Sequence, residues 1–212
     1  MMVDEKQTER RVSYYIGWDV GAWNCDKNSS RDAIAILDSK LAIVGTPWWG
    51  SLRSTINDAN NAKDFIYSLF ALCEINGIPQ STKITMAIDT PLGFSKEFGE
   101  LVTNLKSSGP LGSFATNPYL FRQTERYLFQ IGLKPLSAVK DMIGSQATKG
   151  MHVLAKFAPH IGRCGVWSDN KSFTAIEAYP AAYKESKLIS DLYQQVENRP
   201  FRRDEQDALT CA

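Results

Sequence analysis

The chain has 212 residues, of which 43% are hydrophobic and 22% are charged, and its formal net charge is +1. This composition is typical of a soluble globular protein that builds one sizeable core, and we expect a single domain. The longest apolar runs fall far short of the roughly 20 residues that span a bilayer, so we expect no membrane segment. The near-zero charge lacks the overall basic field that marks many nucleic-acid-binding proteins.

The first residues and the cysteines bear on where the protein resides. Residues 1–11 are charged and no apolar stretch follows them, so we expect a fraying tail rather than a secretory signal, a domain over 12–212 and a cytoplasmic location. Four cysteines lie far apart without a Cys-x-x-Cys pair: Cys25, Cys73, Cys164 and Cys211. This spacing argues against a disulfide framework and a structural zinc site, and we expect reduced thiols.

The first part of the chain predicts three short strands. Residues 12–19 are rich in β-formers, and residues 31–38 and 41–46 form a hairpin around a turn at 38–40. Consecutive short strands of this kind predict an antiparallel meander. Residues 47–50 then leave the sheet as a loop.

Two features of this region are candidates for function. An ionised carboxylate at the end of a buried strand is costly unless it is paired or binds a cation, so Asp19 is a candidate site residue. The alternative is that Asp19 only caps the turn at Val20 and Gly21. Trp48 and Trp49 either stack on bases or sugars or fill the core.

A second strand ends on an aspartate. Apolar residues at helical spacing predict an amphipathic helix over residues 62–75, and residues 83–89 then predict a strand that ends on Asp89. A strand, a helix and a returning strand form a crossover unit, so we expect the two strands to be parallel. Functional sites gather at the carboxyl ends of such strands, where Asp19 and Asp89 would both lie.

A long, mostly helical insertion is expected over approximately 94–171, with a flexible loop or lid at 107–110. Asn117 followed by proline predicts a helix that continues to about residue 131, and a further helix is expected over 142–157. Arg122 and Arg126 would share a face of the first of these helices. Together they would clamp a phosphate, or they would form an ordinary solvated helix face.

The last part of the chain carries further acids. Residues 172–179 predict a strand with Glu177 near its end, residues 181–197 predict a helix, and residues 204–209 begin a last helix. Asp204 and Asp207 are spaced i, i+3 on that helix and can converge on one point. The alternative is that they cap the helix and complement its dipole. The chain stops at Ala212, barely two turns into this helix, which favours an artificial boundary or a missing tail over a natural end.

The acids together predict a metal site. Asp19, Asp89, Asp204 and Asp207 would place about four negative charges close together, and such charges repel by roughly 1 to 4 kcal/mol per pair unless they are protonated or bind cations. Mg²⁺ or Mn²⁺ is the expected cofactor, because hard cations prefer oxygen ligands. Two such metals activate a water and stabilise the leaving oxygen in phosphodiester hydrolysis.

Several motifs resemble those of known families. The element order is similar to the RNase H-like fold, a mixed five-stranded sheet with three antiparallel strands followed by two parallel ones, flanked by helices, with a helical insertion before the last strand. Residues 17–21 (Gly-Trp-Asp-Val-Gly), 87–89 (Ala-Ile-Asp) and 204–209 (Asp-Glu-Gln-Asp-Ala-Leu) resemble the acidic motifs of RuvC-type Holliday-junction resolvases. More closely, the chain resembles the domain-of-unknown-function 429 family of predicted RNase H-like nucleases, through the motifs at 88–93, 122–126, 176–182 and 204–209.

The resemblance implies roles for individual residues. It implies that Asp19 and Asp89 are metal ligands and that Asp204 or Asp207 completes the set. Resolvases usually carry Glu on the second of these strands, so Asp89 is one methylene shorter. Glu177 is an extra acid, which is either a further ligand or base or the ion-pair partner of an arginine such as Arg122 or Arg126.

We therefore predict a metal-dependent nuclease that acts on structured DNA or RNA. Gln146, Lys149 and Arg203 are further candidates to meet a polyanion. The expected partner is nucleic acid, and self-association into a homodimer is left open. Two other functions are considered: a nucleotide-binding or phosphoryl-transfer protein of the actin-like ATPase type, although 212 residues leave no second domain for it, and a binding module that keeps the fold without catalysis.

Overall fold

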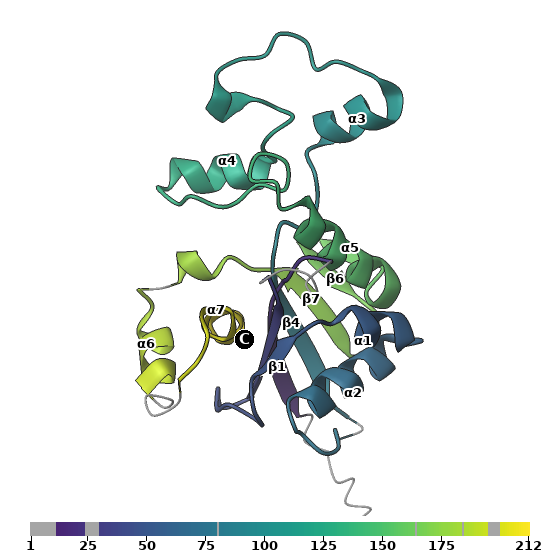
Figure 1. Cartoon of the computed structure of the whole chain (residues 1–212), viewed down its shortest axis with the longest axis vertical. Coiled ribbons are helices and arrows are strands. Elements are labelled where there is room, and N and C mark those ends of the chain that lie inside the picture. Colours follow the sequence, from purple (N-terminus) through teal and green to yellow (C-terminus); the bar gives the residue numbers. More distant parts are fainter. Residues whose placement is uncertain (1–11, 24–29, 80, 164, 184, 195–199) are drawn as a thin grey trace, which may run out of the picture.

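One central sheet organises the protein, as the computed structural model shows (Figure 1). The structure describes residues 12–23, 30–79, 81–163, 165–183, 185–194 and 200–212. The tail predicted over 1–11 lies outside these residues. The strands are β1 (Ser13–Asp19), β2 (Asp32–Asp38), β3 (Trp48–Gly50), β4 (Lys83–Asp89), β5 (His160–Arg163), β6 (Val166–Ser168) and β7 (Phe173–Glu177). The helices are α1 (Arg53–Asp58), α2 (Ala62–Leu72), α3 (Lys96–Asn104), α4 (Gln123–Gln130), α5 (Gly144–Phe157), α6 (Lys187–Gln194) and α7 (Arg203–Cys211), with single 3₁₀ turns at Phe114–Thr116 and Pro180–Ala182.

The sheet is mixed and larger than expected. Within the described residues it has seven strands in the order β3-β2-β1-β4-β7-β6-β5. The pairs β1–β2 and β2–β3 are antiparallel, and β1–β4 and β4–β7 are parallel. The prediction of a parallel crossover between the strands that end on Asp19 and Asp89 is therefore confirmed.

Two predictions about the strands are wrong. The third strand is Trp48–Gly50 and not residues 41–46, of which only Ile43 bridges to Leu37. The paired β5 and β6 extend the sheet beyond β7, so the sheet has seven strands rather than five. This second hairpin lies inside the segment expected to be helical, and Gly165, with a φ of +76°, lies at its turn.

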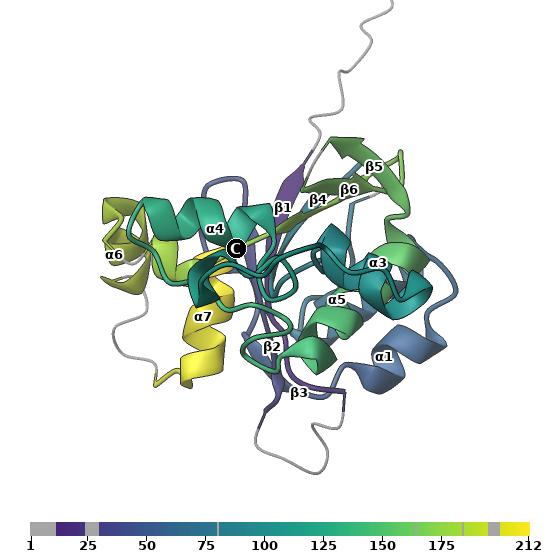
Figure 2. The same cartoon turned by 90° about the horizontal axis from the view of Figure 1, so that it is seen from above.

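Helices cover both faces of the sheet, as the two views show (Figures 1 and 2). On one face, α2 and α5 pack on a large core that includes Ile16, Trp18, Phe65 and Phe157. On the other face, α7 and α6 cover a smaller cluster that includes Leu37 and Leu209. No helix in the part of the chain that the structure describes is long and apolar enough to cross a bilayer.

The helix expected over 142–157 is present as α5 (Gly144–Phe157), whereas two other expected helices differ. The segment after Asn117 forms turns, and α4 begins only at Gln123, with Arg122 as its N-cap. The predicted helix over 181–197 is reduced to a 3₁₀ turn and α6 within the described residues, because Pro180 starts a tight turn. In Figure 1, α3 and α4 lie beyond the carboxyl end of β4. This part of the insertion therefore lies next to the edge of the sheet where Asp19 and Asp89 are found.

Candidate functional site

The site begins with two aspartates on adjacent strands. Asp19 and Asp89 are the last residues of β1 and β4 and are register partners across this parallel pair. Paired residues of neighbouring parallel strands are about 4.8 Å apart along the sheet and point to the same face. Their own neighbours Trp18 and Ile88 belong to the core under α2 and α5, so the two aspartates face α7.

A glycine allows α7 to approach this face. Gly17 lies two residues before Asp19 on the same face, and a Cβ added there would collide with the backbone of Ala208 and Ala212. The neighbouring strand β2 also has small side chains on this face, Ala33 and Ala35, which are buried in the same cluster as Ala208. The helix that carries Asp204 and Asp207 therefore lies directly on the strand that carries Asp19.

The α7 acids are individually positioned. Trp49 of β3 donates its indole N–H to Asp204 Oδ2 at 3.0 Å. Arg203 Nε lies 3.9 Å from Asp207 Oδ2, a weak ion pair because the arginine side chain is 85% exposed. Asp204 is therefore held by the edge strand of the sheet, whereas Asp207 forms a weak ion pair with a solvated side chain of its own helix.

All five predicted acids line one cavity of about 610 Å³. Its floor is formed by the ends of β1, β4 and β7, and its walls by α7, by the segment around Tyr179 and by insertion residues such as Leu128 and Pro135. Arg31, Lys134 and Arg203 add positive charge at the same cavity, and Gln146 also lines it. The structure thus brings the predicted acids together although they are far apart in the sequence.

The acids interact electrostatically. Burial, then the charges of Asp89, Asp204, Asp207 and Asp32, raise the pKa of Asp19 from 3.8 to about 8. Burial, then Asp207 and Glu177, raise the pKa of Asp89 to about 7. A cation bound among these carboxylates would offset the part of both pKa rises that comes from repulsion between the acids.

The residues fit a hard divalent cation in their chemistry and their shared location, because each offers carboxylate oxygens to the same cavity. In the described part of the chain, however, no group of three or more His, Cys, Asp or Glu side chains is arranged to bind a metal ion. Closure of the carboxylates around a cation would therefore involve rotation of their side chains.

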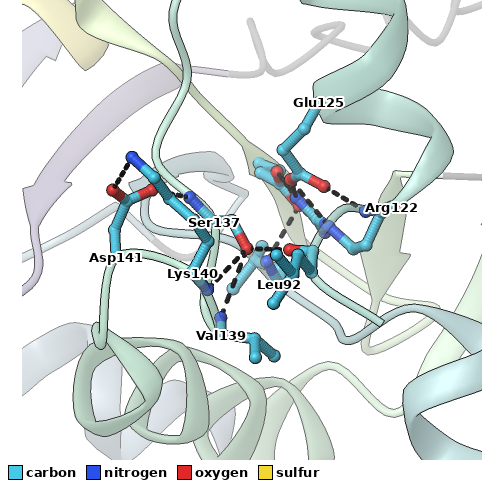
Figure 3. A network of polar contacts seen from close by, with 9 residues as sticks. Leu92, Arg122, Glu125, Ser137, Val139, Lys140 and Asp141 are labelled. Carbon is cyan, nitrogen blue, oxygen red and sulfur yellow. Dashed lines mark hydrogen bonds and ion pairs between the residues drawn. The ribbon is translucent and has the colours of Figure 1, made fainter. Parts of the chain in front are cut away.

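Glu177 belongs to an ion-pair network rather than standing free. Its carboxylate accepts hydrogen bonds from both terminal nitrogens of Arg122, at 2.9 and 2.6 Å, and from the backbone N–H of Leu92 at 2.9 Å. Arg122 also pairs with Glu125, which is buried on α4 (Figure 3). Burial alone would lower the pKa of Arg122, but its bonds to the two glutamates outweigh burial and raise that pKa.

The expectation that Arg122 and Arg126 share a helical face is wrong, because Arg122 caps α4 from outside the helix. Neither arginine lines the cavity. Arg126 donates to the carbonyl oxygen of Thr116 at 3.1 Å, within the insertion. In the same part of the insertion, Ser137 accepts from the backbone of Val139 and Lys140 and donates to the carbonyl oxygen of Leu120, as Figure 3 shows in part.

The sequence patterns gave no sign of a buried ion pair beneath the site. Lys149 of α5 lies 2.5 Å from Asp32 Oδ2, and both side chains are fully buried. Asp32 also accepts hydrogen bonds from the Trp18 indole and from the backbone N–H groups of Gly21 and Leu52. The expectation that Lys149 meets a polyanion is therefore wrong, and the one signal that could have found the pair is a charged residue at the start of an apolar strand.

The cysteines give a partial answer on redox state. Cys73 and Cys211 are free thiols, whereas Cys25 and Cys164 lie outside the described residues. Cys211 is on α7, and burial, then the nearby charges of Asp89, Asp19 and Asp207, raise the pKa of its thiol.

Comparison of the chain with family models, with curated proteins and with solved structures found no match. Any assignment of function to this protein therefore depends on the geometry and chemistry of the acidic cavity.

Proposed function

We propose that the protein is a divalent-cation-dependent phosphodiester hydrolase with an RNase H-like fold, a nuclease that acts on structured DNA or RNA. The observation that carries this proposal is the pairing of Asp19 and Asp89 at the ends of adjacent parallel strands, in one cavity with Asp204 and Asp207. The strand directions support this fold, since β3, β2 and β1 are antiparallel and β1, β4 and β7 are parallel, although the third strand is Trp48–Gly50 and not residues 41–46. The β5–β6 hairpin is an addition at one edge.

In this proposal Asp19 and Asp89 hold Mg²⁺ or Mn²⁺, and Asp204 and Asp207 complete the ligand set. The cation would supply an activated water and a counter-charge for the leaving oxygen. The chain's own contribution is to hold the carboxylates in a half-enclosed cavity, where charge interactions are stronger than in water. Trp49 orients Asp204 through its indole N–H.

Glu177 has a positioning role in this proposal. Through Arg122 and Leu92 it ties the segment after β4 and the insertion to the end of β7. Its charge also contributes to the raised pKa of Asp89. Glu177 therefore raises the pKa of the proposed ligand Asp89, while its own carboxylate oxygens accept hydrogen bonds from Arg122 and Leu92.

Metal binding is the first test. Thermal unfolding is measured with increasing Mg²⁺ and Mn²⁺ for the parent, for Asp19→Asn and for Asp58→Asn, an exposed aspartate at the end of α1. A ligand at about 100 times its Kd stabilises the folded state by about 2.7 kcal/mol. We expect the melting temperature to rise in the parent and in Asp58→Asn but not in Asp19→Asn. An equal rise in melting temperature in all three proteins would rule out metal binding at Asp19.

Cleavage is the second test. The parent and Asp89→Asn are incubated with Mn²⁺ and with branched DNA, single strands and RNA–DNA hybrids. The proposal requires cleavage of at least one substrate by the parent, with a loss of rate in Asp89→Asn. A protein that binds the metal and cleaves none of these substrates would be a binding module.

A further inference from the structure

Three arginines lie beside the acidic cavity, and we call Arg31, Arg202 and Arg203 the arginine rim. Arg31 Cζ lies 5.7 Å from the centroid of the Trp49 ring, and Arg202 Cζ lies 4.5 Å from the same centroid. A guanidinium over an indole face is attracted by the ring and keeps its donors available at its edge. Trp49 therefore gathers two of these cations at one place on the surface.

The rim is continuous with the acids. Arg31 and Arg203 line the same cavity as Asp19, and the Trp49 indole that underlies the rim donates to Asp204. One side chain, Trp49, thus contacts both the cations and an acid of the site. A group bound at the rim would lie next to whatever is bound at the acids.

The rim neutralises those acids only weakly. Arg203 lies 3.9 Å from Asp207 Oδ2, but its side chain is 85% exposed, and such surface pairs contribute little. Among the described residues, Arg31 forms no ion pair with a carboxylate although it shares a cavity with several of them. Arg202 reaches only Glu205, at 3.8 Å, with a side chain that is 61% exposed, and such surface pairs are weak. The guanidinium groups therefore keep hydrogen-bond donors for an external anion, and phosphate matches the planar guanidinium fork.

The cavity restricts what kind of phosphate chain can enter. Insertion residues Leu128 and Pro135 line the same cavity as Asp207, so the acids lie in a recess rather than on a flat face. A duplex is stiff over about 150 base pairs, whereas a single strand bends and can splay its bases. A single strand can therefore place one phosphate at the acids and its neighbour on the rim.

We propose that the arginine rim binds the phosphate adjacent to the scissile one in a single nucleic-acid strand, or in a single-stranded part of a structured molecule. This inference rests on the proposed function, because it takes the acids as the site of cleavage. It makes a polymer the substrate in preference to a mononucleotide, since a mononucleotide has no second phosphodiester for the rim.

Binding of a labelled strand tests the rim. Fluorescence anisotropy is measured in EDTA with an oligothymidylate of about 12 nucleotides, within the usual site size for single strands, and with a duplex of the same length. The double variant Arg31→Ala/Arg202→Ala is compared with Lys40→Ala/Arg163→Ala. The control removes the same charge from two exposed positions that lie outside the cavity.

The rim predicts a specific salt dependence. Each phosphate contact on a single strand contributes a slope of about −0.7 to log K against log salt, so losing two contacts should reduce the slope by about 1.4. We expect the rim variant to bind at least about tenfold more weakly at low salt, the control to bind like the parent, and the parent to prefer the strand over the duplex. Circular dichroism and melting temperature check that each variant is folded.

Two outcomes overturn the inference: equal affinity and slope in the rim variant and the parent, or a parent that prefers the duplex. The proposed function is assessed separately on the parent, through its Mg²⁺-induced thermal shift and its hydrolysis of bis(4-nitrophenyl) phosphate. If the parent shows both and the rim variant binds the strand normally, the rim inference falls and the proposed function stands. If the parent shows neither, the proposed function falls.

Discussion

The metal-free protein should be more stable when Asp19 cannot ionise. Its pKa is raised in the folded state from 3.8 to about 8, so the folded state binds a proton that the unfolded state has already lost. The stabilisation from this proton is complete below pH 4 and is lost as the pH rises towards 8. We therefore expect Asp19→Asn to have little effect near pH 4 and to raise the melting temperature at pH 8.

The size of this effect can be worked out from the pKa. One pKa unit is worth about 1.4 kcal/mol, so an ionised Asp19 opposes folding at pH 8 by on the order of 5 kcal/mol. Asp19 is partly exposed, so solvent screening and rotation of the neighbouring acids reduce this value, and we expect asparagine to recover about 2 kcal/mol. For a chain of this size that corresponds to roughly 4 to 8 °C.

Thermal unfolding in EDTA between pH 4 and pH 8.5 measures the effect. Asp58→Asn, which removes an exposed charge on α1, should follow the parent at every pH. Adding Mg²⁺ should stabilise the parent and narrow its gap to Asp19→Asn. A difference between Asp19→Asn and the parent that does not change with pH would refute the claim that burial and the neighbouring acids raise the pKa of Asp19 in the folded protein.

Three further substitutions probe the framework of the site. Lys149→Met should lower the free energy of unfolding by about 3 to 5 kcal/mol, because it leaves Asp32 buried without its partner; urea unfolding measures it, and a loss below about 1 kcal/mol would contradict the pairing. Arg122→Ala should cost about 2 to 3 kcal/mol, since its side chain is only 16% exposed and Glu177 loses its partner; an unchanged urea midpoint would count against the network. Gly17→Ala should push α7 off β1 and abolish the Mg²⁺-induced thermal shift, and a folded variant that retains the full shift would show that the close approach is dispensable.

The sequence predicted elements with strong local patterns. The β-rich run that ends on Asp89 and the amphipathic pattern of α2 both have a clear period, and both elements are present within a few residues of their predicted ends. The β5–β6 hairpin was missed because its strands have four and three residues and contain Gly162, so neither shows a period. Trp48–Gly50 was missed for the same reason.

The candidate site was predictable only in part. That Asp19 and Asp89 would be neighbours could be deduced from the crossover rule, which depends on the order of elements alone. Lys149 and Asp32 are 117 positions apart in the sequence, and Arg122 and Glu177 are 55 positions apart. Such pairs depend on the register and tilt of α5 and of the insertion, which no local pattern encodes.

The place of α7 in the chain order has a consequence for when the proposed site can form during synthesis. Asp19 and Asp89 lie in elements that can pair once the first half of the chain has emerged, but Asp204 and Asp207 emerge more than a hundred residues later. Until α7 docks against Gly17, the nascent protein lacks half of the proposed ligands. If the protein is the nuclease proposed above, an unfinished chain would lack the complete ligand set needed to cut the RNA from which it is being translated.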